Sequence, residues 1–229
     1  MRFQVTLRSY LSSLFLLTAP AYINAAPFEI SGQVKLLSFG QALRATEAVD
    51  AVIYFKPKAA VALVAPKNAA LMTTERKQFQ PGVLPILVGS SVRFPNKDPI
   101  LHNAFSTAAG NAFDTDLYGQ GDGATQIFKS VGIVRVYCNV HHSMVSHILV
   151  LNTPYFAKPD STGRFNIKGV QAGAGELFVW HERAPLFRKP IMLAANHIEA
   201  VQLNLSRRKI PPHLNKFGKP YRRTSGGEY

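Results

Sequence analysis

The stretch YCNVHHSM, residues 137–144, holds the single cysteine of the chain. It continues a run in which Val134, Val136 and Cys138 occupy alternate positions and therefore share one face of an expected strand. A second apolar run, at 147–151, begins after a loop of about eight residues. We therefore expect a loop between two strands, with its thiol pointing inward beside the valines.

Strand-like segments separated by turn residues continue in both directions from this loop, and no long stretch has helical periodicity. Many short strands at such spacing predict an all-β chain made of β-sandwiches. An alanine-rich stretch at 59–77 is either a linker or a short helix interrupted at Pro66. The expected strands lie at 30–37, 48–57, 132–138, 147–151, 164–167, 175–180 and 200–205, with two more inside 83–94.

The N-terminus has the layout of a secretory signal peptide. Arg2 and Arg8 precede an apolar stretch that is too short to span a bilayer, and small residues follow at 19–26. We expect residues 1–25 to be removed, which leaves a mature chain of 204 residues in the periplasm or outside the cell. No later segment reaches spanning length, and one cysteine cannot form a disulfide within the chain.

Composition indicates a folded and strongly basic protein. Hydrophobic residues make up 47% of the chain and charged residues 17%, which suits a buried core. The net charge of +13 is concentrated at 206–229, where seven basic residues accompany one acid. This segment is expected to be a flexible tail that either aids solubility or docks on an acidic partner or an anionic membrane surface. Nucleic acid is not an expected partner of an exported chain.

Three side chains of the opening stretch are candidate metal ligands. Cys138, His141 and Met144 offer a thiolate, an imidazole and a thioether, a set that suits copper better than calcium or magnesium. A trigonal copper site needs a second imidazole, and His102 follows a strand 36 residues upstream of the cysteine. Zinc is less suitable, since methionine is a poor zinc ligand and a structural zinc site more usually has a second cysteine.

The spacing Cys-x-x-His-x-x-Met resembles the ligand loop of amicyanin and other cupredoxins, and His102-Asn103 resembles their upstream ligand with its following asparagine. This resemblance implies a Greek-key β-sandwich with one copper ion. It implies His102, Cys138 and His141 as equatorial ligands and Met144 as the axial ligand. Asn103 would steady the cysteine loop by hydrogen bonding. Residues 78–182 also resemble exported cupredoxin-like proteins called methylamine-utilisation proteins.

The flanking segments resemble a different domain. SGQV to AVIYF (31–55) and DSTGRF to VWH (160–181) are similar to the two halves of a carboxypeptidase-regulatory-like, or transthyretin-like, β-sandwich. This likeness implies a small β-sandwich that the copper domain interrupts; the alternative is a tandem order in which the N-terminal strands belong to the copper domain. The predicted units are a signal peptide at 1–25, a small sandwich at 26–58 and 153–205, a linker at 59–77, a cupredoxin domain at 78–152, and a basic flexible tail at 206–229.

Other candidate motifs are incomplete. Asp114 and Asp116 suggest calcium, but Tyr118 stands where an EF-hand-type loop needs an oxygen ligand, and the terminal glutamate is missing. His142 has the wrong spacing for the ligand loop and is expected at the rim of the site. A copper oxidase or nitrite reductase needs further histidine-rich sites, and the remaining histidines do not form one; they are His142, His147, His181, His197 and His213.

Four protein ligands leave no coordination position for a substrate, so we expect an electron carrier rather than an enzyme. The edge of His141 is the expected site of electron entry and exit. The expected partner is a periplasmic redox protein, and an acidic surface on that partner would complement the basic charge of this chain. Two alternatives stay open. The chain is then either a copper-handling or copper-sensing protein, or a structural binding module whose metal site is empty.

Overall fold

The computed structural model describes residues 27–206 and 213–221. It is nearly all β, as predicted, and the only helix in the described ranges is a 3-10 turn, η1 (Ala45–Asp50). The predicted signal peptide, residues 1–25, lies outside these ranges, as do 207–212 and 222–229 of the predicted tail. No helix among the described residues is long and apolar enough to cross a membrane.

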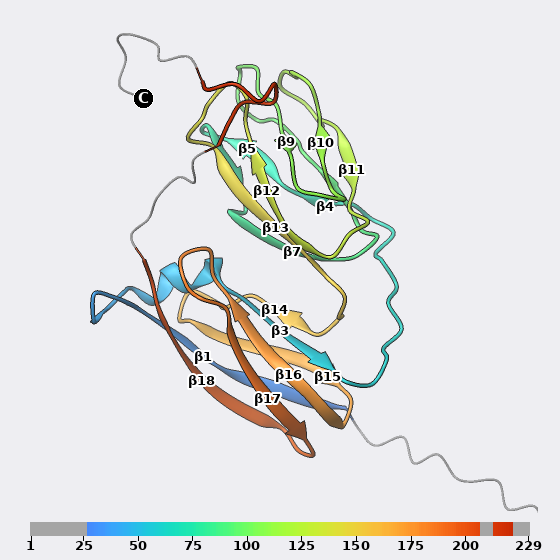
Figure 1. The fold of residues 1–229 in the computed structure, drawn as a ribbon, viewed down its shortest axis with the longest axis vertical. Coiled ribbons are helices and arrows are strands. Elements are labelled where there is room, and N and C mark those ends of the chain that lie inside the picture. The colour runs from blue at the N-terminus through green and yellow to red at the C-terminus, as the bar shows by residue number, and fades with distance from the viewer. Residues whose placement is uncertain (1–26, 207–212, 222–229) are drawn as a thin grey trace, which may run out of the picture.

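Two β-sandwiches lie one above the other in Figure 1, and we call them the lower and upper halves after these places. In the lower half, two sheets enclose a core that includes Ile53, Phe55 and Leu177. One sheet has the order β15 (Arg164–Val170), β1 (Phe28–Ser38), β18 (His197–Asn204), with β2 (Gln41–Ala42) paired to β1. The other has the order β14 (Phe156–Ala157), β3 (Val52–Pro57), β16 (Gly173–Trp180), β17 (Phe187–Leu193).

The upper half encloses a separate core that contains Phe94, Val134, Val136 and Ile148. Its largest sheet has the order β10 (Phe113–Asp114), β9 (Phe105–Ser106), β12 (Gly132–Tyr137), β13 (Val145–Leu151), β7 (Val83–Leu87). The remaining strands form two small sheets, β11 (Thr125–Ile127), β8 (Ser91–Arg93), β4 (Ala70–Leu71) and the pair β5 (Thr73–Glu75), β6 (Gln78–Gln80).

The two halves meet through the outer faces of two sheets. Side chains alternate across a strand, so on β13 Ile148 faces the upper core while Leu149 and Leu151 face the junction. From the lower half, Phe178 and Trp180 of β16 belong to the same junction cluster. Strands buried on both faces have continuous apolar sequences, which explains the unbroken runs in β3 and β13.

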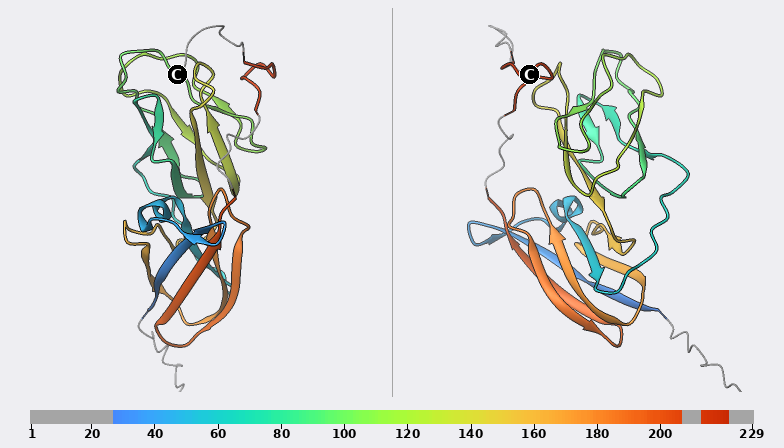
Figure 2. Two further views of the ribbon diagram at one scale, coloured as in Figure 1. Left: turned by 90° about the vertical axis from the view of Figure 1, so that its left-hand side faces the viewer. Right: turned by 45° about the vertical axis from the view of Figure 1, so that its right-hand side comes forward.

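The upper half is continuous in sequence, whereas the lower half is not. Strand β3 leads out of the lower half, and β14 returns to it and pairs with β3 (Figure 2). Residues 59–69 connect the halves without regular structure, and 70–75 contain the strands β4 and β5. The alternative of a short helix at 59–77 is therefore wrong, because Pro66 and the β-branched run near 73–74 favour extended backbone.

Candidate metal centre

The loop between β12 and β13 and the chain before β9 meet at one end of the upper half. β12 ends at Tyr137, directly before Cys138, and Tyr137 pairs with Phe105 of β9. His102 lies just upstream of β9 and forms a bridge with Tyr118, in which each residue donates its backbone N–H to the other's carbonyl oxygen. Strand pairing therefore brings His102 beside the cysteine loop.

Three of the predicted ligands form one group. Each of His102, Cys138 and His141 offers a ligand atom, and these atoms all lie within 4.8 Å of one another. The Nδ1 atom of His102 is 3.8 Å from the Sγ atom of Cys138. The two imidazole centroids are 4.9 Å apart, with the rings inclined by 46°. Within the described ranges, this is the group of histidine, cysteine and acidic side chains close enough to hold a metal ion.

Met144 lies on the buried side of the same loop. Its side chain is 1% exposed and belongs to the hydrophobic cluster that contains Cys138. The Met144 N–H donates to the carbonyl oxygen of His141 at 3.0 Å, and the Cys138 N–H donates to the carbonyl oxygen of Met144 at 3.3 Å. These two bonds return the end of the loop to its beginning.

Asp98, which no sequence motif predicted, orients His102. Its Oδ2 atom is 2.9 Å from Nε2 of His102, on the side of the ring away from the thiol. The backbone N–H groups of Arg76 and Lys77 donate to the same carboxylate, at 2.6 and 2.9 Å. Burial raises the pKa of Asp98, but the bonds from Lys77, Arg76 and His102 outweigh it and lower the pKa below its usual value.

His141 has a buried ring nitrogen with no hydrogen-bond partner. Its Nδ1 atom is inaccessible to water and unpaired within the described residues, although the side chain as a whole is partly exposed. Burial lowers the pKa of His141, and the charges of His102 and Lys77 lower it further. A neutral imidazole with an unpaired nitrogen beside a thiol is suited to binding a metal ion, since an unsatisfied buried nitrogen otherwise costs free energy.

Asn103 links the cysteine loop to β10 through two hydrogen bonds. Its Oδ1 atom accepts a hydrogen bond of 2.6 Å from the N–H of Asn139, the residue after Cys138. Its amide Nδ2 donates to Asp114 at 2.7 Å. Asn103 thus fixes the peptide that follows the cysteine, and Asp114 serves in this network rather than in a calcium-type loop.

Residues 213–221, within the predicted flexible tail, lie against the same loop. Lys216 donates its backbone N–H to Oδ1 of Asn139 at 3.0 Å, and its Nζ atom lies 2.7 Å from Asp114 and 3.0 Å from Asp116. The hydroxyl of Tyr221 donates to the carbonyl oxygen of Cys138 at 3.1 Å. No sequence pattern predicted this contact, because a basic segment with proline and glycine has no strand periodicity.

The remaining histidines lie outside the group of three. His142 is exposed, and its ring centroid is 6.0 Å from that of Tyr221. His147 contacts Trp180 at the junction, and His197 contacts Glu199 in the lower half. They do not form a second cluster of metal-binding side chains among the described residues.

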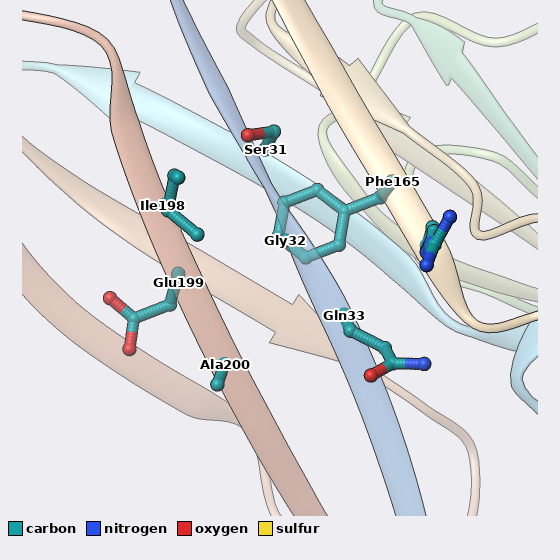
Figure 3. A pocket seen from close by; sticks show the side chains of 8 residues that line it. Ser31, Gly32, Gln33, Phe165, Ile198, Glu199 and Ala200 are labelled. Carbon is teal, nitrogen blue, oxygen red and sulfur yellow. The ribbon is translucent and has the colours of Figure 1, made fainter.

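A hollow of about 340 Å³ lies far from this loop, over β1 and β18. Figure 3 shows the ring of Phe165 lying over Gly32 at its floor, while the carboxylate of Glu199 points away. Glu199 is instead paired with Lys189 and His197. The hollow therefore contributes nothing to the metal centre.

No protein-family model matches the sequence, and no curated protein matches it. Several solved structures resemble part of the chain. Amicyanin from Paracoccus versutus is 16% identical over 43% of this chain and 98% of its own, with a TM-score of 0.35. A purple cupredoxin from Nitrosopumilus maritimus is 23% identical over 36% and 99%, with a TM-score of 0.33. A copper-containing nitrite reductase from Thermus scotoductus is 22% identical over 52% and 28%, with a TM-score of 0.37.

Proposed function

We propose that this chain is an exported copper protein that carries single electrons. In this proposal His102, Cys138 and His141 are the equatorial ligands of one copper ion, and Met144 is its axial ligand. The observation that carries the proposal is the group of one thiol and two imidazoles within 4.8 Å, of which Cys138 and His102 are fully buried.

The donor set favours copper over other metals. Thiolate, thioether and imidazole are soft or intermediate ligands, whereas calcium and magnesium prefer oxygen. A second cysteine, usual in structural zinc sites, does not exist in this chain. The unpaired Nδ1 of His141 and the Nδ1 of His102 facing the thiol are the atoms expected to bind the ion.

A copper ion bound here would supply a one-electron redox couple. The protein prepares the ligands for it. Cys138 must lose its proton and both histidines must be neutral, which is the state that burial favours for an imidazole. Asp98 accepts the Nε2–H of His102, so the lone pair of Nδ1 is directed at the thiol. The sheet framework holds all these groups in place, so little movement need accompany electron transfer.

Electrons would enter and leave at His141, because its side chain is the partly exposed one among the three. The basic chain would attract an acidic redox partner through a small, transient contact of less than about 1,200 Å². Four protein ligands leave no position for a substrate, so we propose an electron carrier and not an enzyme. Export to the periplasm belongs to the same proposal and depends on the predicted signal peptide.

The decisive experiment is an absorption spectrum with copper quantitation on the mature protein. We expect one copper per chain and an intense visible band from sulfur-to-copper charge transfer, which Cys138→Ser abolishes. Retention of the band in that variant refutes the assignment. Freely exchanging Cu(I) without a reversible Cu(II) colour would favour copper handling, and absence of stoichiometric copper would favour a structural module.

Replacing the axial ligand tests the fourth assignment separately. Met144→Gln should keep copper bound and shift the reduction potential, since the axial ligand tunes a blue-copper site without holding it. The measurement is a redox titration of the variant beside the unchanged protein. Loss of all metal would point to a different coordination by the loop.

A further inference from the structure

Both polar groups of the peptide between Cys138 and Asn139 are bound by side chains from distant parts of the chain. The N–H of Asn139 donates to Asn103, 36 residues upstream. The carbonyl oxygen of Cys138 accepts the hydroxyl of Tyr221, 83 residues downstream. The peptide next to the thiol is therefore held from two sides.

The same residues form a closed network of hydrogen bonds and one ion pair. Asn139 donates to Asn103, and Asn103 donates to Asp114. Asp114 pairs with the Nζ of Lys216, and the backbone N–H of Lys216 donates back to the side-chain oxygen of Asn139. The Lys216 side chain is only 16% exposed, which limits screening of its pair with Asp114. The basic segment thus has an acidic partner within its own chain.

Aromatic rings complete the contact. His213 stacks on Tyr137, the last residue of β12, with centroids 4.1 Å apart and the rings inclined by 15°. Tyr221 meets the His213 ring edge-on at 5.2 Å. Residues 213–221, red in Figure 1, lie along the end of the upper half at which β12 enters the ligand loop.

We propose that residues 213–221 are the outer wall of the metal centre, and that Tyr221 and Lys216 are positioning residues that hold the Cys138–Asn139 peptide in its metal-binding conformation. The role of this wall at the metal centre rests on the proposed copper function, but its hydrogen bonds to the cysteine loop do not require a metal ion. The segment binds no ligand itself; it limits the movement of the thiol and keeps water from the backbone beside it.

The wall also affects the charge around the thiol. Lys216 lies between Asp114 and Asp116, so removing its charge leaves two carboxylates uncompensated beside the loop. The Tyr221 hydroxyl points the positive end of its O–H dipole at the carbonyl oxygen of Cys138. Both groups disfavour additional positive charge at the centre, and therefore both disfavour the oxidised state of a bound metal.

The restraint that residues 213–221 place on the loop is tested on the metal-free protein by hydrogen exchange. Tyr221→Phe removes one hydroxyl, and Lys216→Gln removes the charge that anchors the segment. Lys219→Gln is the matched control, because Lys219 has the same charge in the same segment and is exposed. We expect the amide of Asn139 to exchange about fivefold faster in the first two variants, as for loss of one ordinary hydrogen bond, and unchanged in the control. Unchanged exchange in Tyr221→Phe and Lys216→Gln overturns the proposal.

The effect on the centre is tested on the copper-loaded protein by redox titration. Tyr221→Phe and Lys216→Gln should both lower the reduction potential, while Lys219→Gln should shift it much less. A general loss of packing would change thermal stability without this pattern, so equal potentials in all variants also overturn the positioning role. If the unchanged protein binds no copper but the variants show the expected exchange pattern, the copper function is wrong, while the restraint of the loop by residues 213–221 is confirmed.

Discussion

Asp98 binds no ion in the proposed centre, yet three hydrogen bonds fix its carboxylate beside His102. Two of them come from consecutive backbone N–H groups, at Arg76 and Lys77, whose φ angles are 54° and 56°. Positive φ at both loop residues is typical of a tight two-residue hairpin turn, here between β5 and β6, and this turn places two donors on one carboxylate. The orientation of a ligand thus depends on a segment 25 residues upstream of it.

Asp98→Asn should weaken copper binding by about 10- to 100-fold, because the neutral amide cannot stabilise the His102 imidazole as a carboxylate does. The measurement is a competition titration against a copper chelator. Asp122→Asn, at an exposed position, is the control and should bind copper as the unchanged protein does. An affinity in Asp98→Asn equal to that of the control would contradict the orienting role.

The sequence was sufficient to propose which side chains meet and that Asn103 steadies the cysteine loop, but it did not indicate the roles of Asp98 and Tyr221. The spacing of Cys138, His141 and Met144 is local, so the loop alone suggests a metal site. Asp98 has no such signal, because it acts through a turn at 76–77 that the sequence does not reveal. The docking of Tyr221 is still less predictable, since it depends on one hydroxyl reaching one carbonyl oxygen far away in the chain.

Strand β1 shows how closely two neighbouring elements can approach. Gly32 pairs with Phe165 of β15 on one side and with Glu199 of β18 on the other. A Cβ atom at Gly32 would lie 1.8 Å from the carbonyl oxygen of Glu199 and 3.0 Å from the Phe165 ring. The glycine is therefore required by the space between the strands.

Gly32→Ala should destabilise the protein by about 3 kcal/mol, since a backbone oxygen cannot move aside as a flexible side chain can. Urea denaturation of the two proteins measures the difference. Gly119→Ala is the matched control, because its nearest neighbour would be a Leu101 methyl group at 3.8 Å, an ordinary contact. Equal midpoints for Gly32→Ala and the control would show that β1 and β18 can separate at little cost.

Alternation and apolar runs predicted the longer strands well, because in a strand with one buried face every second side chain points into the core. β1, β12, β13, β15, β16 and β18 all overlap their expected ranges. β17 was missed, since Arg188, Lys189 and Pro190 interrupt any apolar pattern in it. The parallel pairing of β1 with β18 was not predictable, because it joins segments from opposite ends of the described chain.

The junction between the halves combines apolar packing with a buried histidine. His147 of β13 is 4% exposed and contacts the ring of Trp180, with centroids 5.4 Å apart. Burial lowers its pKa to about 4, and the charges of Arg135 and His181 act in the same direction. The carboxylate of Glu182 lies 3.6 Å from its Nδ1 atom, too far to outweigh them. His147 is therefore neutral at pH 7.

Because the folded pKa of His147 lies below its value of 6.5 in the unfolded chain, the unfolded state takes up a proton first as the pH falls. The stability should be complete above pH 6.5 and decrease by about 3 kcal/mol between there and pH 4. The measurement is the free energy of unfolding of the metal-free protein against pH. His147→Gln should flatten this decrease, whereas His142→Gln, at an exposed position, should not; equal slopes would contradict the assignment.

The insertion of the upper half into the lower one has a consequence for the order of folding. Ile30 must find His197, a partner synthesised far later, and closing so long a loop is entropically costly. The hairpin of β12 and β13 is local, so the upper half can form early and bring β3 next to β14. The folded upper half then holds β3 and β14 together, which shortens the chain that must still be closed. Until it has formed, β1 lacks its partner β18 and exposes a strand edge that favours aggregation.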